Sequence, residues 1–244
     1  MAKKIKTRSQ QNTHRVQLPE KQSGPSRAFW QSPILWLVVL PVLVYAKIVF
    51  FDFTALDDQF FVIDHAAFNQ DLGNLFKVFN QGLFVPKNDI YYRPVFLIDM
   101  ILENHLFGIK PWGYHLLSLI FHLISVCLLF IFLKRIRIPE TPAFLLALFF
   151  AVCPVLTQTV AWIPGRNDLL LMIFLLSSLI CVIEYFRTRE MHLFAAQFIT
   201  FLLALLTKET AVIFLFSPSL SCGLFFQLKF RRCFPPWHPG FWLY

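Results

Sequence analysis

The stretch "WGYHLLSLIFHLISVCLLFIFL" (112–133) contains no lysine, arginine, aspartate or glutamate. An α-helix needs about 20 mainly apolar residues to cross the hydrocarbon core of a bilayer, and this stretch is long enough. It is followed at once by "KRIR" (134–137), and short clusters of lysine and arginine favour the cytoplasmic side of a membrane. The stretch therefore predicts a transmembrane helix whose carboxyl end faces the cytoplasm.

The composition extends this interpretation to the whole chain. Hydrophobic residues make up 57% of the 244 residues and charged residues only 15%, whereas soluble domains carry about 25% charged residues. A single soluble core of this size could not hide so much apolar surface. We therefore expect an all-α, polytopic membrane helical bundle of about six transmembrane helices. The apolar runs that predict them are 33–51, 112–133, 142–162, 169–186, 192–207 and 211–228.

The basic segments predict the topology and the domain boundaries. "RTR" (187–189) and "KFRR" (229–232) follow the fourth and sixth runs as "KRIR" follows the second, so all three would share one face with the basic amino-terminal segment. That face is expected to be cytoplasmic. We expect a disordered basic tail at 1–30, a membrane domain at 31–228 and an irregular tail at 229–244. The basic tail carries no nucleic-acid recognition motif, so no nucleic-acid partner is expected.

The segment 52–111 would form a long first loop on the extracytoplasmic face. Eight of the 14 acidic residues of the chain lie in it. "AAFNQDLGNLFKVFNQGLF" (66–84) has apolar residues at helical spacing, which predicts an interfacial helix along the membrane surface. A second short helix is expected through "PVFLIDMILENHLFG" (94–108). The apolar side of the first helix would hold Leu72, Leu75, Phe76 and Phe79.

Two adjacent aspartates, Asp57 and Asp58, lie in "TALDDQFF" (54–61), just beyond the first span. Phenylalanines flank them on both sides, so at least one carboxylate is expected to be partly desolvated. A carboxylate in such a setting suits a general base, because a base must lie at a fixed position next to the proton that it removes. The alternative is that both are ordinary solvated loop carboxylates.

Further ionisable residues fall at predicted outer helix ends. Arg93 lies between aromatic residues and a proline in "YYRP", Arg166 and Asp168 lie in "GRNDLL", and Lys208 and Glu209 lie in "TKETA". Each has a structural alternative: an interface anchor for Arg93, an Arg166–Asp168 pair or a helix cap at Asp168, and a Lys208–Glu209 salt bridge. Together they predict a cleft on one face of the membrane that binds an anionic head group.

His115 and His122 are seven residues apart in the second run and so share one face of that helix. Ionisable residues within a membrane are rare, and His115 near the outer end is a candidate contact for a polar ligand. His122, two turns deeper, is equally a hydrogen-bonded packing residue. A haem-binding electron carrier that uses these histidines is disfavoured because both lie on one helix. A transporter is disfavoured because the predicted membrane interior is nearly free of charge.

Five motifs resemble one family: "DDQFFV", "YYRPV", "NHLFGIKPWGYHLLSLIFH", "PVLTQTVAWIPGRNDLL" and "LLALLTKETA". Over residues 33–215 the chain is similar to the transmembrane O-mannosyltransferases with tetratricopeptide repeats and their bacterial relatives, which belong to the polytopic GT-C glycosyltransferase class. The resemblance implies a polyprenyl- or dolichyl-phosphate-linked sugar, mannose above all, as donor. It implies a serine or threonine hydroxyl of an acceptor protein as the acceptor, and no cofactor.

The resemblance also implies roles and a location. Asp57 and Asp58 correspond to the catalytic acid of the first outer loop. The chain would lie in the endoplasmic-reticulum membrane or a bacterial inner membrane and would be a truncated, amino-terminal part of such an enzyme. A non-catalytic membrane protein, either a remnant or an assembly partner, is therefore the alternative function. The residues assigned to the substrate cleft are Arg93, His115, Arg166, Asp168, Lys208 and Glu209.

Overall fold

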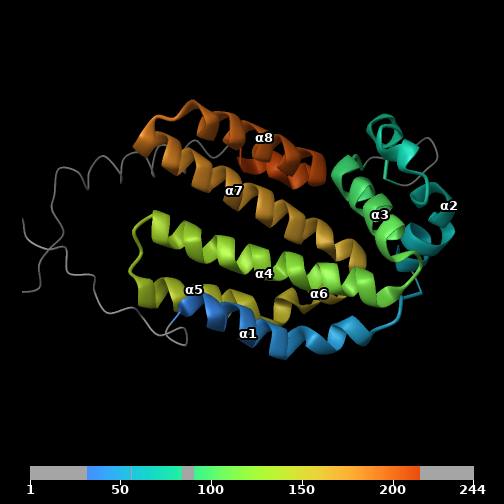
Figure 1. The fold of residues 1–244 in the computed structure, drawn as a ribbon, viewed down its shortest axis with the longest axis horizontal. Coiled ribbons are helices and arrows are strands. Elements are labelled where there is room, and N and C mark those ends of the chain that lie inside the picture. The colour runs from blue at the N-terminus through green and yellow to red at the C-terminus, as the bar shows by residue number, and fades with distance from the viewer. Residues whose placement is uncertain (1–31, 56, 84–90, 215–244) are drawn as a thin grey trace, which may run out of the picture. The chain divides into compact units, whose positions relative to one another are not determined.

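Five apolar helices run side by side and are joined at one end by a smaller group of short helices (Figure 1). This computed structural model describes residues 32–55, 57–83 and 91–214, and those from Pro33 on belong to one compact unit. The predicted tails at 1–30 and 229–244 lie outside the described residues. The long helices are α1 (Pro33–Tyr45), α4 (Pro111–Arg135), α5 (Glu140–Val152), α7 (Arg166–Thr188) and α8 (Met191–Thr207).

The described part of the chain is all-α, as predicted, and contains no strand. Within the described ranges, three segments are long and apolar enough to cross a membrane: Pro33–Phe50, Pro111–Arg135 and Ile163–Thr188. Glu140–Val152 and Pro154–Ala161 form a fourth if the bent pair is one span. The fifth predicted span corresponds to α8, a shorter apolar helix of 17 residues. Most of the sixth, at 211–228, lies outside the described residues.

Small residues let α5 approach its neighbours closely. Ala143, Ala147 and Ala151 recur every four residues and are fully buried against Leu37 of α1 and Val126 of α4. Without water between helices, membrane helices associate by close van der Waals packing, which small residues at this spacing permit. Large apolar side chains such as Leu145 and Phe149 point outward and are more than half exposed. This inverted arrangement, with bulky residues outside, suits a lipid environment.

The α5 span is broken at Pro154, which bends the chain by 46° before α6 (Thr157–Ala161). Proline has no N–H and interrupts the helical hydrogen bonds around it. Two buried side chains from other helices bond to carbonyls at this break. The His122 ring nitrogen Nε2 lies 2.8 Å from the Ala151 carbonyl oxygen, and the Tyr45 hydroxyl donates to the Cys153 carbonyl at 3.2 Å. Since a carbonyl only accepts, Nε2 carries the proton, and His122 is a packing residue that caps the break.

Replacing His122 with leucine should therefore destabilise the bundle. The variant leaves the Ala151 carbonyl without its side-chain donor in a water-free interior, which should cost about 1–3 kcal/mol of unfolding free energy. Thermal unfolding in detergent measures the effect. Ser125→Ala is the matched control, because this buried hydroxyl bonds only to the His122 carbonyl one turn earlier in its own helix. Equal midpoints for both variants would contradict the capping role.

The outer loop contains the second predicted helix, whereas the first predicted helix is divided into short pieces. Helix α3 (Pro94–Phe107) confirms the prediction for 94–108. Residues 66–84 do not form a continuous interfacial helix: the Asp71 side chain accepts from the Gly73 amide at 2.8 Å and turns the chain there. Such local bonds compete with helix, and glycine disfavours it further. The pieces are α2 (Ala66–Asn69), η4 (Leu72–Leu75) and η5 (Lys77–Asn80).

The predicted apolar side of that segment divides accordingly. Leu75 packs against the buried core formed by the loop and α3, whereas Leu72, Phe76 and Phe79 are exposed. Two glycines then set the turn into α4. Gly108 has a φ of 59°, which disfavours other residues, and a Cβ on Gly113 would lie 2.3 Å from the Phe107 ring. The loop is thus folded tightly onto the first turn of α4.

Candidate active site

Asp58 is fully buried at the start of η3 (Gln59–Asp64), where the loop leaves the first span. Its Oδ2 atom accepts hydrogen bonds from the Thr54 amide at 2.9 Å and the Thr54 hydroxyl at 2.7 Å. Its Oδ1 atom is buried and has no hydrogen-bond partner among the described residues. One carboxylate oxygen is thus fixed by the loop while the other keeps its lone pairs free. Asp57, beside it, is partly exposed.

His115 is a second buried polar residue here with unpartnered atoms. It is 1% exposed, and neither of its ring nitrogens has a partner among the described residues. The Asp52 backbone lies near the ring without the geometry of a hydrogen bond, and the Phe51 ring meets it edge-on at 6.3 Å. The carboxylate of Asp58 and the guanidinium of Arg166 both act on His115 electrostatically.

Arg166, at the start of α7, is fully buried between two carboxylates of α3. Its Nη1 atom donates to Asp99 at 3.0 Å and pairs with Glu103. Its Nε and Nη2 atoms donate to the Ser118 hydroxyl at 3.1 and 2.9 Å, and Nη2 also donates to the Tyr114 carbonyl at 2.6 Å. Every nitrogen of the guanidinium is therefore bound within the protein.

Glu103 has an unusual electrostatic setting. It is 1% exposed, and its Oε1 atom has no hydrogen-bond partner in the described part of the chain. Desolvation by burial raises the pKa of Glu103 well above its usual range, although Arg166 opposes the shift; Asp99 adds to it. Two carboxylates compete for one guanidinium, and the more deeply buried one holds its proton more tightly. The cluster is thus close to electrically neutral when Glu103 is protonated.

The remaining predicted residues form two ion pairs at the same end of the bundle. Lys208 pairs with Asp168, and Arg93 donates to Glu209 from Nη2 at 2.6 Å and from Nε at 3.1 Å. The hydrogen bond from Arg93 is the main cause that lowers the pKa of Glu209. The carboxylates are about half exposed, whereas the Arg93 and Lys208 side chains are 15% and 22% exposed. Asp168 lies in the first turn of α7 but makes no cap bond.

The ion pairs in the structure differ from the two that were considered as structural alternatives. Arg166 pairs with Asp99 and Glu103 and not with Asp168, and Lys208 pairs with Asp168 and not with Glu209. The sequence interpretation missed Asp99, Glu103 and Ser118 as site residues. The sequence did contain a signal for Asp99 and Glu103, because carboxylates four residues apart on a largely apolar helix lie on the same face. In the described ranges, no group of three or more His, Cys, Asp or Glu side chains is placed to hold a metal ion.

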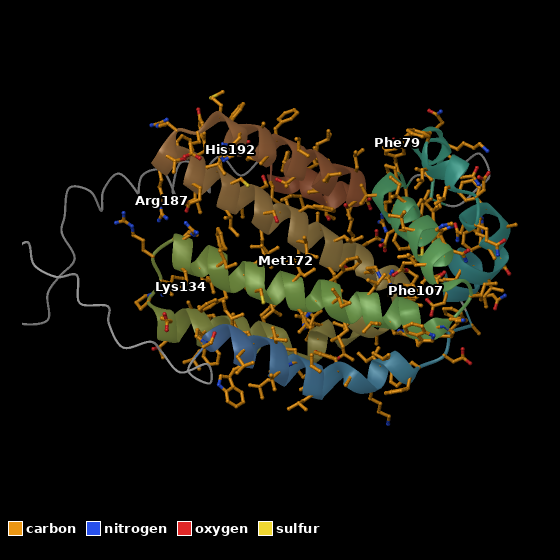
Figure 2. The ribbon with its side chains drawn as sticks, in the orientation of Figure 1. Phe79, Phe107, Lys134, Met172, Arg187 and His192 are labelled. Carbon is orange, nitrogen blue, oxygen red and sulfur yellow. The ribbon has the colours of Figure 1, made fainter. Side chains whose placement is uncertain are left out.

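The opposite end of the bundle is basic. Figure 2 shows Lys134, Arg187 and His192 there, far from Phe79 and Phe107 at the loop end. Arg187 donates to Glu184 at 3.0 Å and to the Arg135 carbonyl at 2.8 Å, and Arg135 also pairs with Glu184. The candidate site and this basic rim therefore lie at opposite ends.

A family model described as dolichyl-phosphate-mannose-protein mannosyltransferase matches residues 94–235, more than half of the chain. The chain belongs to this mannosyltransferase family. The resemblance drawn from the five motifs is confirmed at this level. The mannosyltransferase match begins with α3 and includes Arg166 and Lys208, while Asp57 and Asp58 precede it.

Curated relatives are named as protein O-mannosyl-transferases. Protein O-mannosyl-transferase TMTC2 of Mus musculus is 35% identical over 98 residues, which are 40% of this chain and 12% of that protein. Protein O-mannosyl-transferase Tmtc1 of Drosophila melanogaster is 32% identical over 134 residues, 54% of this chain and 15% of that protein. Protein O-mannosyl-transferase TMTC4 of Mus musculus is 28% identical over 177 residues, 65% and 24% of the two chains.

The chain thus spans 12% to 24% of the length of those relatives. No solved structure was found to match it.

Proposed function

We propose that the chain forms part of the catalytic module of a protein O-mannosyltransferase in which Asp58 is the general base. The observation that carries the proposal is the buried Oδ1 atom of Asp58, which has no hydrogen-bond partner among the described residues while Thr54 holds the carboxylate in place. A base must be fixed and must have a free lone pair directed at the proton that it removes. Among the two predicted aspartates, this favours Asp58 over the partly exposed Asp57.

The proposed reaction is a single displacement on dolichyl-phosphate mannose. The acceptor serine or threonine hydroxyl loses its proton to Asp58 as its oxygen bonds to the anomeric carbon. The bond from that carbon to the phosphate oxygen breaks, and its electron pair leaves on the dolichyl phosphate. Cations stabilise the charge that grows on this leaving group.

Lys208 and Arg93 suit the phosphate better than Arg166 does. Their carboxylate partners, Asp168 and Glu209, are about half exposed, so the pairs can open to an anion at little cost. Arg166 is buried and already bound to two carboxylates. His115, without a hydrogen bond of its own, is available to a hydroxyl of the sugar or acceptor.

The proposal places this chemistry on the lumenal or periplasmic face and the amino terminus in the cytoplasm. The support is the separation of the acidic loop end from the basic rim that holds Arg135 and Arg187. A lipid-linked donor remains in the bilayer, because each methylene of its chain costs about 0.8 kcal/mol to transfer into water. Residues 31–228 are proposed as the membrane domain that meets it.

The test is mannose transfer in membranes from cells that express the chain. Radiolabelled dolichyl-phosphate mannose should label endogenous proteins above the level of membranes without the chain, and β-elimination should release the label as O-linked mannose. Labelled GDP-mannose, with synthesis of the lipid donor blocked, should give no label. Equal labelling with and without the chain would reject the catalytic function and favour the assembly-partner alternative.

A further inference from the structure

Arg166 is fully buried, and its guanidinium is occupied by contacts within the protein. Arg166 has five N–H donors, and all three of its nitrogens already contact Asp99, Glu103, Ser118 or the Tyr114 carbonyl. No donor is left for a lipid phosphate. The same contacts, however, join three elements, because the partners lie on α3 and α4 while Arg166 begins α7.

The contacts continue from Arg166 to the loop that carries Asp58. Arg166 donates hydrogen bonds to the first turns of α4, at the Tyr114 carbonyl and the Ser118 hydroxyl. The ring of Tyr114 packs edge-on against Phe53, with 5.6 Å between the ring centroids. Phe53 is followed directly by Thr54, whose amide and hydroxyl hold Asp58. One short series of contacts thus links the guanidinium to the proposed base.

His115 provides a second, parallel link. It follows Tyr114 in the chain, its ring meets Phe51 edge-on, and both Arg166 and Asp58 act on it electrostatically. The Tyr114 and His115 rings therefore form the surface of α4 against which the Phe53 and Phe51 rings pack. If that surface shifts, the hydrogen bonds from Thr54 to Asp58 must shift with it.

We propose that Arg166 is a positioning residue, which fixes the start of α4 and thereby holds the Thr54–Asp58 turn in the geometry that the proposed transfer reaction needs. This inference rests on the proposed function only for its consequence in catalysis. The mechanical link itself does not depend on which reaction the site performs. Preorganised sites commonly depend on such supporting contacts, because small displacements of a reactive group weaken its action.

The experiment is hydrogen exchange on the full chain in detergent micelles, read at residues 51–55 and at the cytoplasmic end of α4. Arg166→Lys keeps the charge but loses the forked set of donors. It should raise the exchange rate of the Thr54 amide about tenfold, the effect of losing roughly one charged hydrogen bond. Ser118→Ala, which removes one partner and is milder, should raise it less. Arg135→Lys, a matched substitution at the basic rim, should leave it unchanged.

Thr54 exchange at the wild-type rate in both site variants would overturn the proposal. An equal increase in the exchange rate at the cytoplasmic end of α4 would also overturn it, because the variant would then loosen the helix as a whole. Transfer activity adds a separate readout: Arg166→Lys should lower kcat with little change in KM for the donor. If the wild-type chain transfers no mannose, the proposed function fails while the exchange result still decides the positioning role.

Discussion

Arg166→Met should lower the free energy of unfolding by about 3–5 kcal/mol, the largest loss of stability expected from a single substitution in this chain. Methionine fills much of the space but cannot pair with a carboxylate. Asp99 and Glu103 would then face each other in a buried site without a cation. Thermal or denaturant unfolding in detergent measures the difference.

Two controls isolate the buried charge as the cause. Near pH 5, Glu103→Gln should change stability by no more than about 1 kcal/mol, because the neutral amide resembles the protonated acid and retains its hydrogen-bonding shape. Arg135→Met removes an arginine that pairs with Glu184 but is 42% exposed, and should cost about 0–1 kcal/mol. If Arg166→Met is no more harmful than Arg135→Met, the buried cluster does not hold the helices together.

The pH dependence of Glu103→Gln follows from the raised pKa of Glu103. Above the usual carboxyl range the unfolded chain has released this proton, while the folded chain still binds it. The folded state therefore binds more protons, and this group's contribution to stability falls as the pH rises towards its folded pKa. The stability of Glu103→Gln relative to wild type should accordingly increase from pH 5 upward, as followed by unfolding midpoints across pH. A constant difference would show that Glu103 titrates normally.

Asp58→Asn should lower kcat for mannose transfer by about 10²- to 10⁴-fold, the usual contribution of a general base. The amide oxygen can still accept both hydrogen bonds from Thr54, so the turn should keep its shape. It cannot take up the proton of the attacking hydroxyl. Steady-state transfer from dolichyl-phosphate mannose should show an unchanged KM for the donor. A rate within threefold of wild type would remove Asp58 from the mechanism.

The long helices could be predicted because a bilayer requires every span to have a minimum length and an apolar surface. Helices α4 and α7 follow the runs 112–133 and 169–186 for this reason. The run 142–162 was predicted as one span, and Pro154 divides it. That proline was visible, but the two side chains that make the break tolerable, His122 and Tyr45, come from helices distant in the sequence.

The pairings within the candidate site could not be predicted from local spacing. Residues two apart on a helix, such as Arg166 and Asp168, point to different faces, so each finds a partner on a different neighbour. The consecutive residues Lys208 and Glu209 likewise bind partners on different elements, α7 and the start of α3. Which of the paired aspartates is buried could not be predicted either, because both have the same apolar neighbours in the sequence, yet Asp58 is buried and Asp57 is partly exposed.

The central claim, that Asp58 rather than its neighbour accepts the proton, is tested most directly by single-turnover transfer from protein loaded with dolichyl-phosphate mannose. Asp57→Asn and Asp58→Asn change adjacent residues identically, so the pair removes the effects of net charge and expression. We expect transfer near the wild-type rate for Asp57→Asn and a loss of at least about 100-fold for Asp58→Asn, with the donor bound equally by both. Loss of transfer in Asp57→Asn with retention in Asp58→Asn would contradict it.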